Sequence, residues 1–166
     1  MSTKDNLKEA FSGESQANRL YLAFAKKADA ENLPNVAKLF RAAAAAETVH
    51  AHAHLLAMEG VKSTEDNLKE AIEGEGYEFK SMYPKFLEGA KAEGARPAEM
   101  SFKYALAVEE IHHRLYQKAL DSVESGSDIA LRKVFVCDIC GNTVYDEPPQ
   151  RCPICNAPIG KFKEID

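Results

Sequence analysis

The chain has 166 residues, enough for one good hydrophobic core and a small additional domain. Its net charge of −5 argues against nucleic-acid binding, and no apolar run approaches the roughly 20 residues that a membrane span needs. The first residues, MSTKDNLKEAF, lack the apolar region of a secretion signal, so we expect a cytoplasmic protein.

Four long helices are predicted, at residues 3–29, 35–59, 65–93 and 97–125. Pro34 suits the first turn of the second helix, and Ser63 or Thr64 is expected to cap the third. Short connections between long helices predict antiparallel neighbours. The expected fold class is therefore an all-α four-helix bundle of up-down topology.

An internal repeat divides this helical region into two halves. The segment NLKEAFSGES, which begins at Asn6, returns as NLKEAIEGEG 61 residues later. Farther along the offset becomes 62, so that Glu47 corresponds to Glu109 and His50 to His112. We attribute the extra residue to a loop. The chain is thus interpreted as two copies of one helix pair, whose inner faces meet across a pseudo-twofold axis.

Acidic residues interrupt the apolar stripe of every predicted helix, and two helices carry Glu-x-x-His. Carboxylates buried together cost several kcal/mol each and repel one another, whereas two bound cations would remove both penalties. One Glu from each of two helices and Glu-x-x-His from each of the others is typical of a ferritin-like di-iron or di-manganese bundle. The candidate ligands are Glu14 in the first helix, Glu47 and His50 in the second, Glu75 in the third, and Glu109 and His112 in the fourth.

The repeat fails at Glu78, which corresponds to Ala17 in the first copy. Because Glu78 follows Glu75 by three residues, one metal ion has an additional carboxylate within reach. An ion that exchanges Glu78 for His50 as its charge changes would indicate redox cycling, since ferric iron prefers anionic oxygen. The other interpretation is that Glu78 faces solvent beside Lys80.

Other polar residues of the helices leave alternatives open. In the fourth helix, VEEIHHRLY also permits Glu110 with His113 as the ligand pair, although the repeat favours Glu109 with His112 and leaves the other two solvated. Tyr21 and Tyr83 are candidates for hydrogen bonds to the ligand carboxylates, or else for simple packing. We interpret His54, one turn after His50, as a core histidine.

The helical pattern ends after Ser125, and KVFVC is predicted to be a short strand. We expect the domain boundary near Leu131, which gives a helical domain at 1–131 and a small β-rich domain at 132–166. Two Cys-x-x-Cys pairs in this tail predict a tetrathiolate metal site. The four cysteines are Cys137, Cys140, Cys152 and Cys155. Their spacing does not separate iron from zinc, and by itself slightly favours a structural zinc ribbon.

Taken together, the chain resembles the rubrerythrin family through GES, AAETVHAHAH, EGEGYEFKSMYP and VEEIHHRLY, and through CDICG and CPICN in a rubredoxin-like tail. The resemblance implies two non-haem irons in the helical domain and one iron in the tail, where zinc is a possible substitute. The implied ligands are Glu14, Glu47, His50, Glu75, Glu78, Glu109 and His112 for the first site, and the four cysteines for the second. Asn142 and Asn156 depart from the usual tail pattern, which leaves the tail's redox potential open.

The family is implicated in reducing hydrogen peroxide in the cytoplasm of anaerobic bacteria and archaea, so the resemblance implies a peroxidase active in oxidative-stress defence. Electrons would arrive from an external reductase or small carrier, because the sequence holds no G-x-G-x-x-G motif for a nicotinamide or flavin. Two rival hypotheses remain. One is a ferroxidase or iron-storage protein of ferritin type, and the other is a non-enzymatic module with zinc in both sites.

We also expect a head-to-tail homodimer. The stretch from His112 to Ser125 spans roughly 20 Å of helix, so the tail begins far from its own chain's di-iron site. A twofold partner would bring one chain's tail to the other's site. The alternative is that the linker folds the tail back onto its own helices.

Overall fold

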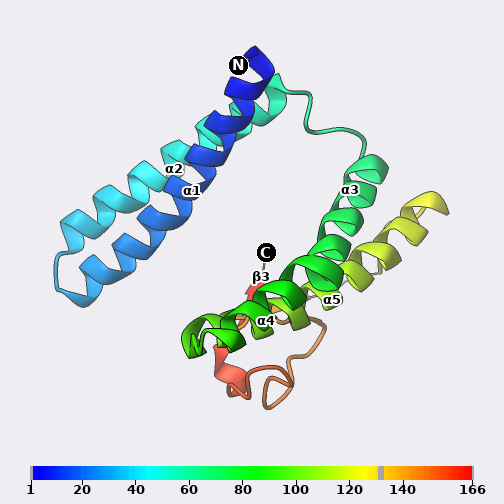
Figure 1. The fold of residues 1–166 in the computed structure, drawn as a ribbon. Helices are drawn as coiled ribbons and strands as arrows, with labels where there is room; N and C mark the ends of the chain where they lie inside the picture. Colours follow the sequence, from blue (N-terminus) through cyan, green and yellow to red (C-terminus); the bar gives the residue numbers. More distant parts are fainter. Residues whose placement is uncertain (1, 131–132, 166) are drawn as a thin grey trace. The chain divides into compact units, whose positions relative to one another are not determined.

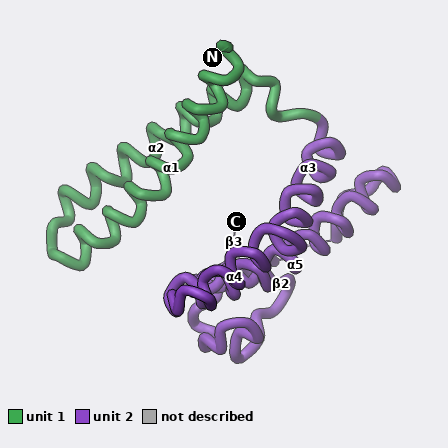
Figure 2. Tube along the Cα trace, viewed as in Figure 1, with its two compact units in different colours: residues 1–62 green, residues 63–166 purple. Residues whose placement is uncertain are grey.

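The computed structural model describes residues 2–130 and 133–165. The chain divides into two compact units, Met1–Lys62 and Ser63–Asp166 (Figure 2). The first unit is a helical hairpin, and the second contains the remaining helices and a small antiparallel sheet (Figure 1). The fold class predicted from the sequence, a helical protein with a small C-terminal β region, is confirmed.

The first unit consists of α1 (Thr3–Ala30) and α2 (Pro34–Ala57). The two helices run side by side over their length (Figure 1). At their contact Ala25, Ala28 and Ala37 are almost fully buried. Small side chains let the two backbones approach closely, and this leaves the larger apolar and acidic residues for other faces of the hairpin.

The predicted helix starts agree with the structure. Pro34 is at the first turn of α2, where its missing N–H costs no hydrogen bond. Ser63, rather than Thr64, caps the third helix, because the backbone N–H of Asp66 donates to Ser63 Oγ at 3.1 Å. Of the two residues that the sequence offered as the cap of the third helix, the structure therefore selects Ser63.

The second unit begins with α3 (Thr64–Tyr77), the π-helical segment η1 (Glu78–Met82) and α4 (Tyr83–Ala92). These three segments together form the third predicted helix. The fourth is α5 (Arg96–Glu124). All four predicted helices are confirmed, with a π-helical interruption that the periodicity did not reveal.

The π-helix explains why the repeat changes its offset. Before η1 the two copies correspond at 61 residues, as for Glu14 and Glu75; after it they correspond at 62, as for Tyr21 and Tyr83. The extra residue therefore lies inside a helix, and our assignment of it to a loop is wrong. A π-helix accommodates one added residue without breaking the helix, and such bulges are frequent at functional sites.

Matching aromatic clusters support this correspondence. In the first unit the ring centroids of Phe24 and Phe40 lie 5.6 Å apart, and Tyr21 lies 6.2 Å from Phe40. In the second unit the corresponding distances are again 5.6 and 6.2 Å, within the cluster formed by Tyr83, Phe86 and Phe102. The inserted residue has thus not disturbed the packing that follows it.

The tail forms a three-stranded antiparallel sheet of order β2-β1-β3. Its strands are β1 (Val134–Cys137), β2 (Thr143–Tyr145) and β3 (Phe162–Ile165), with a 3-10 turn η2 (Ile159–Lys161) before the last. The strand predicted at KVFVC is confirmed as β1. The boundary predicted near Leu131 lies outside the described residues, so the division at 131 and 132 remains a prediction.

No helix in the described part of the chain is both long enough and apolar enough to cross a membrane.

The cap of α3 generates a stability prediction. Replacing Ser63 by Ala should lower the free energy of unfolding by about 1 kcal/mol, because the N–H of Asp66 loses its partner at the helix start. Urea denaturation followed by circular dichroism measures this change. Thr64→Ala is the matched control and should change stability by less than about 0.5 kcal/mol. Equal effects of the two substitutions would contradict the assignment of Ser63 as the cap.

Candidate metal centres

In the first unit, one carboxylate from α1 meets a Glu-x-x-His pair from α2. Glu14, Glu47 and His50 each offer a ligand atom within 4.8 Å of the others. His50 Nδ1 lies 2.9 Å from Glu47 Oε2 and 3.9 Å from Glu14 Oε1. The cluster presents two carboxylates and one imidazole nitrogen toward a common point, a donor set that suits a divalent cation.

The second unit repeats this arrangement with α3 and α5. Glu75, Glu109 and His112 form a cluster within the same 4.8 Å limit. His112 Nδ1 lies 2.9 Å from Glu109 Oε2 and 3.8 Å from Glu75 Oε1. The two units therefore build the same three-residue cluster with nearly the same distances, as the internal repeat predicts.

Burial makes the carboxylates of the second cluster difficult to ionise. Desolvation and the neighbouring charge of Glu109 raise the pKa of Glu75 to about 7. Desolvation also raises the pKa of Glu109, with the charge of Glu78 adding to it. In the first unit, by contrast, hydrogen bonding to His50 lowers the pKa of Glu47. Two carboxylates that ionise with difficulty, placed beside an imidazole, suit a di- or trivalent cation. The charge of the cation would take the place of the protons on the carboxyl groups.

The structure favours one register of the fourth helix. Glu109 and His112 face Glu75, whereas Glu110 is exposed and lies 4.0 Å from Arg114. His113 is half-buried rather than solvated, and our expectation for it is wrong.

His113 instead packs between two helices of the second unit. Its ring centroid lies 5.2 Å from that of Phe79 in an edge-on contact. A Cβ on Gly76 would lie 3.2 Å from the His113 ring, so the glycine permits this close approach. His113 therefore contributes to packing rather than to the carboxylate cluster.

Glu78 occupies the first position of the π-helix. It is half-buried, while Lys80 nearby is exposed, which disfavours the interpretation that Glu78 merely faces solvent. Its charge contributes to the raised pKa values of Glu75 and Tyr83. Glu78 is thus close to the second cluster without belonging to its three-residue core.

Two tyrosines lie near the carboxylates of the second unit. Burial and then the charge of Glu78 raise the pKa of Tyr83. Burial and then the charge of Glu75 raise the pKa of Tyr116. The sequence analysis did not select Tyr116 as a residue near the carboxylates. Its position one turn after His112, on the same face of the helix, could have indicated this. Among the residues that the structure describes, the contacts of Tyr21 are aromatic, with its ring 6.3 Å from Phe24 and 6.2 Å from Phe40.

The four cysteines of the tail converge on one point and form no disulfide. Cys137 Sγ lies 3.7 Å from Cys155 Sγ, and Cys140 Sγ lies 3.5 Å from Cys152 Sγ. A tetrahedral ion with metal–sulfur bonds of roughly 2.3 Å requires sulfur–sulfur edges of about 3.8 Å. The thiols are therefore spaced as a tetrathiolate site requires.

Two left-handed residues shape the knuckles that present these thiols. Gly141 has φ 83° and Asn156 has φ 61°. Their backbone N–H groups donate to Cys137 O at 2.8 Å and Cys152 O at 2.9 Å. Burial raises the pKa of the Cys152 thiol, but backbone N–H groups and neighbouring thiols outweigh this and bring its pKa to about 7. Burial raises the pKa of Cys155 in the same knuckle, so the metal-free site favours a thiolate at Cys152 and not at Cys155.

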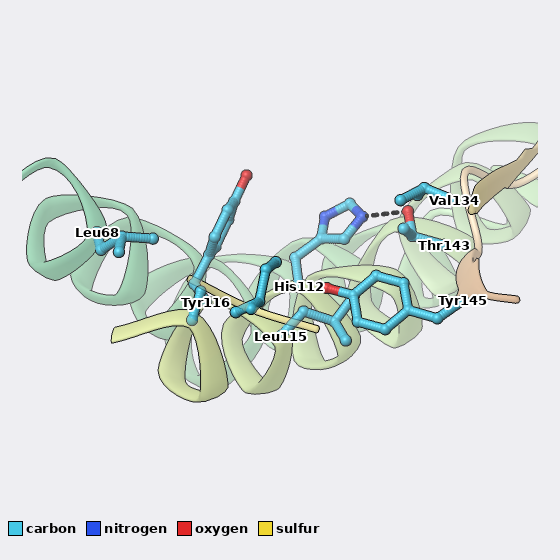
Figure 3. Close-up of a pocket in the computed structure, with 9 residues that line it drawn as sticks. Leu68, His112, Leu115, Tyr116, Val134, Thr143 and Tyr145 are labelled. Carbon is cyan, nitrogen blue, oxygen red and sulfur yellow. Dashed lines mark hydrogen bonds between the residues drawn. The ribbon is translucent and has the colours of Figure 1, made fainter. Parts of the chain in front are cut away.

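The tail packs against α5 of its own chain, beside the second cluster. His112 Nε2 lies 2.9 Å from Thr143 Oγ1 on β2 (Figure 3). Both line a largely apolar pocket of about 340 Å³ that also includes Tyr116 and Tyr145. The premise that the tail lies far from its own metal cluster is therefore wrong, because the chain after α5 folds back. The head-to-tail homodimer remains a prediction, without this distance argument.

The raised pKa of Glu75 predicts how the metal-free protein responds to pH. Between about pH 4.5 and 7 the folded chain keeps a proton on Glu75 that the unfolded chain has released. Stability should therefore fall as pH rises through this window, and Glu75→Gln should reduce the fall. Urea denaturation of metal-free protein at pH 4.5, 6 and 7.5 measures it.

The control is Glu73→Gln, at an exposed position of the same helix, which should keep the pH dependence of the parent. If Glu75→Gln loses stability with pH as steeply as the parent, burial does not hinder ionisation at this carboxylate.

Comparison with known proteins supports the family resemblance. A family model described as Rubrerythrin matches residues 5–120, and one described as Rubrerythrin, rubredoxin-like domain, matches residues 135–163. Rubrerythrin-2 of Clostridium acetobutylicum is 39% identical over 175 residues, covering 97% of this chain and 95% of that protein. Nigerythrin of Nitratidesulfovibrio vulgaris is 35% identical over 175 residues, covering 97% of this chain and 85% of that protein.

Solved structures give a consistent result. The structure titled as the fully reduced, all-ferrous state of nigerythrin has a TM-score of 0.57 and 32% identity, covering 99% of this chain and 87% of that one. A mixed-valence state of nigerythrin has a TM-score of 0.56 and 33% identity. The family models that match residues 5–120 and 135–163 agree with the relative that covers 97% of this chain. The chain therefore belongs to the rubrerythrin family.

Proposed function

We propose that the chain is a non-haem di-iron peroxidase that reduces hydrogen peroxide to water. The observation that carries the proposal is the pair of matching Glu–Glu–His clusters together with a four-thiol tail whose Thr143 is hydrogen-bonded to His112 of one of them. Family membership supports an iron-dependent oxidoreductase, because relatives of the same length carry the rubrerythrin name. The carboxylates and imidazoles suit ferrous and ferric ions alike.

The proposed ligand set combines both clusters with the additional carboxylate of the π-helix. Its members are Glu14, Glu47, His50, Glu75, Glu78, Glu109 and His112. Iron held there would supply the electrons that peroxide reduction consumes. Glu78 would serve as an anionic alternative to His50 when the ion charge increases, and its half-buried position near Glu75 is consistent with this role.

Reduction of hydrogen peroxide to two waters takes two electrons and two protons. Tyr83 and Tyr116 carry hydroxyl protons at neutral pH, as tyrosines ordinarily do, and burial with neighbouring carboxylates raises their pKa values further. They are the proposed proton donors near the second cluster.

The tail is the proposed entry point for electrons. Its four thiols would hold one iron, and zinc at this place would leave the tail without a redox role. An external reductase or small electron carrier would deliver electrons to it, and the cytoplasm is the proposed location. A homodimer is retained as part of the proposal.

Metal analysis separates this proposal from its rivals. Three irons per chain and a red ferric tetrathiolate colour in protein purified without oxygen support the peroxidase. Tens of irons per chain would instead indicate a storage protein of ferritin type, which leaves the tail's contact with α5 without a purpose. Colourless protein with zinc in both sites would indicate a non-enzymatic module.

Replacing Cys152 by Ser should abolish the red colour and slow multiple turnover at least tenfold, because one thiolate is lost from the electron entry site. A prereduced sample of the same variant should still consume one equivalent of peroxide in a single turnover. Stopped-flow mixing with peroxide measures both rates. Loss of the single turnover as well would show that the tail is required for more than electron supply.

Replacing Glu78 by Ala should leave the fold intact and reduce steady-state turnover about 10- to 100-fold, because the oxidised site loses an anionic ligand. Glu88→Ala, at an exposed position of α4, is the matched control and should turn over at the parental rate. Peroxide consumption and iron content are measured together. A Glu78→Ala variant with full iron and the parental rate rules out the ligand role of Glu78.

A further inference from the structure

The two ring nitrogens of His112 have different surroundings. Nδ1 faces the carboxylates, 2.9 Å from Glu109 Oε2 and 3.8 Å from Glu75 Oε1. Nε2 points the other way and lies 2.9 Å from Thr143 Oγ1 in the tail (Figure 3). One imidazole therefore contacts both the metal cluster and the domain that carries the thiols.

The direction of this hydrogen bond follows from the second partner of Thr143. Its hydroxyl donates its single proton to the carbonyl oxygen of Gly141 at 3.1 Å. With that proton engaged, the hydroxyl oxygen is free to accept from His112, and we assign the proton of the neutral imidazole to Nε2. Nδ1 then carries the lone pair that a metal ion requires, and without the ion its 2.9 Å contact with Glu109 Oε2 needs a proton on the carboxyl.

The corresponding histidine of the first unit lacks this support. The His50 side chain is 55% exposed against 27% for His112. Within the residues that the structure describes, the hydrogen bonds of His50 are confined to Nδ1. The tail therefore makes the two otherwise equivalent histidines different, and it orients only one of them.

We propose that Thr143 is a positioning residue that holds His112 as the Nε2–H tautomer, and that metal binding at Nδ1 in turn tightens the docking of the tail on α5. A cation on Nδ1 withdraws charge from the ring and makes Nε2–H a stronger donor to Thr143. Coupling of this kind is reciprocal, so docking strengthens metal binding by the same factor. The inference rests on the proposed metal centre.

The surrounding contacts allow such coupling. Thr143 follows Cys140 by three residues, so the segment that shapes a thiol knuckle also reaches His112. The same segment contacts α5 directly, because a Cβ on Gly141 would lie 3.7 Å from Val108 Cγ1. Movement of this segment away from α5 would break the hydrogen bond to His112.

Three variants test the proposal. Thr143→Val keeps the branched shape but removes the hydroxyl, and Thr143→Ser keeps the hydroxyl. Tyr145→Phe is the matched control, because it removes a hydroxyl from the same pocket without touching the bond to His112. Each protein is prepared with zinc already in the cysteine site and is then titrated with iron(II) without oxygen.

We expect Thr143→Val to bind iron at the carboxylate clusters 10- to 100-fold more weakly than the parent. Thr143→Ser and Tyr145→Phe should remain within about twofold of it. Hydrogen exchange at residues 141–145 should slow when iron binds in the parent and in Thr143→Ser, but not in Thr143→Val. These readouts do not depend on peroxidase activity.

Two results would overturn the inference in distinguishable ways. Equal iron affinity of the parent and Thr143→Val, with the same iron-dependent slowing of exchange in the tail, shows that Thr143 does not position His112. This outcome leaves the proposed function intact. A parent that binds no iron at the carboxylate clusters overturns the proposed function, and the inference with it.

Discussion

The structure depends on carboxylates placed where helix pairs ordinarily bury apolar side chains. In the second unit burial raises the pKa values of Glu75 and Glu109, with the charge of Glu109 adding at the first and that of Glu78 at the second, so protons or a cation must compensate. The imidazole of His112 completes a ligand set suited to the cation. Burial and then the charges of the same carboxylates raise the pKa values of the neighbouring Tyr83 and Tyr116. The cost of burying charge therefore acts on the carboxylates and on the tyrosines beside them.

Duplication supplies this arrangement twice, and one inserted residue makes the copies unequal. The His-to-Glu distances agree between the units within 0.1 Å, and so do the compared distances in the aromatic clusters. The π-helix η1 adds a residue and begins with Glu78, for which the first copy has Ala17. The same insertion thus coincides with the additional carboxylate, and it leaves the packing of the following turns unchanged. A local change in helix type is enough to differentiate two repeated sites.

The tail adds a second source of asymmetry. By docking on α5 it orients His112 through Thr143, whereas His50 of the first unit lacks an equivalent contact among the described residues. A fixed histidine in the second unit and a less constrained one in the first agree with the proposed exchange of Glu78 and His50. The tail, proposed as the entry point for electrons, and the geometry of the second cluster are then parts of one arrangement.

The sequence alone determined the features that depend on neighbours within a few residues. Helical periodicity placed the four helices and selected Glu109 with His112, and the Cys-x-x-Cys spacing defined the thiol site, because each is a local pattern. The offsets of 61 for Glu14 with Glu75 and 62 for Tyr21 with Tyr83 did bracket the extra residue within the third predicted helix, but only the structure showed that a π-helix accommodates it. The half-burial of His113 and its contact with Phe79 were equally hidden. The bond between His112 and Thr143 joins residues 31 positions apart across a linker without periodicity, so only tertiary packing decided it.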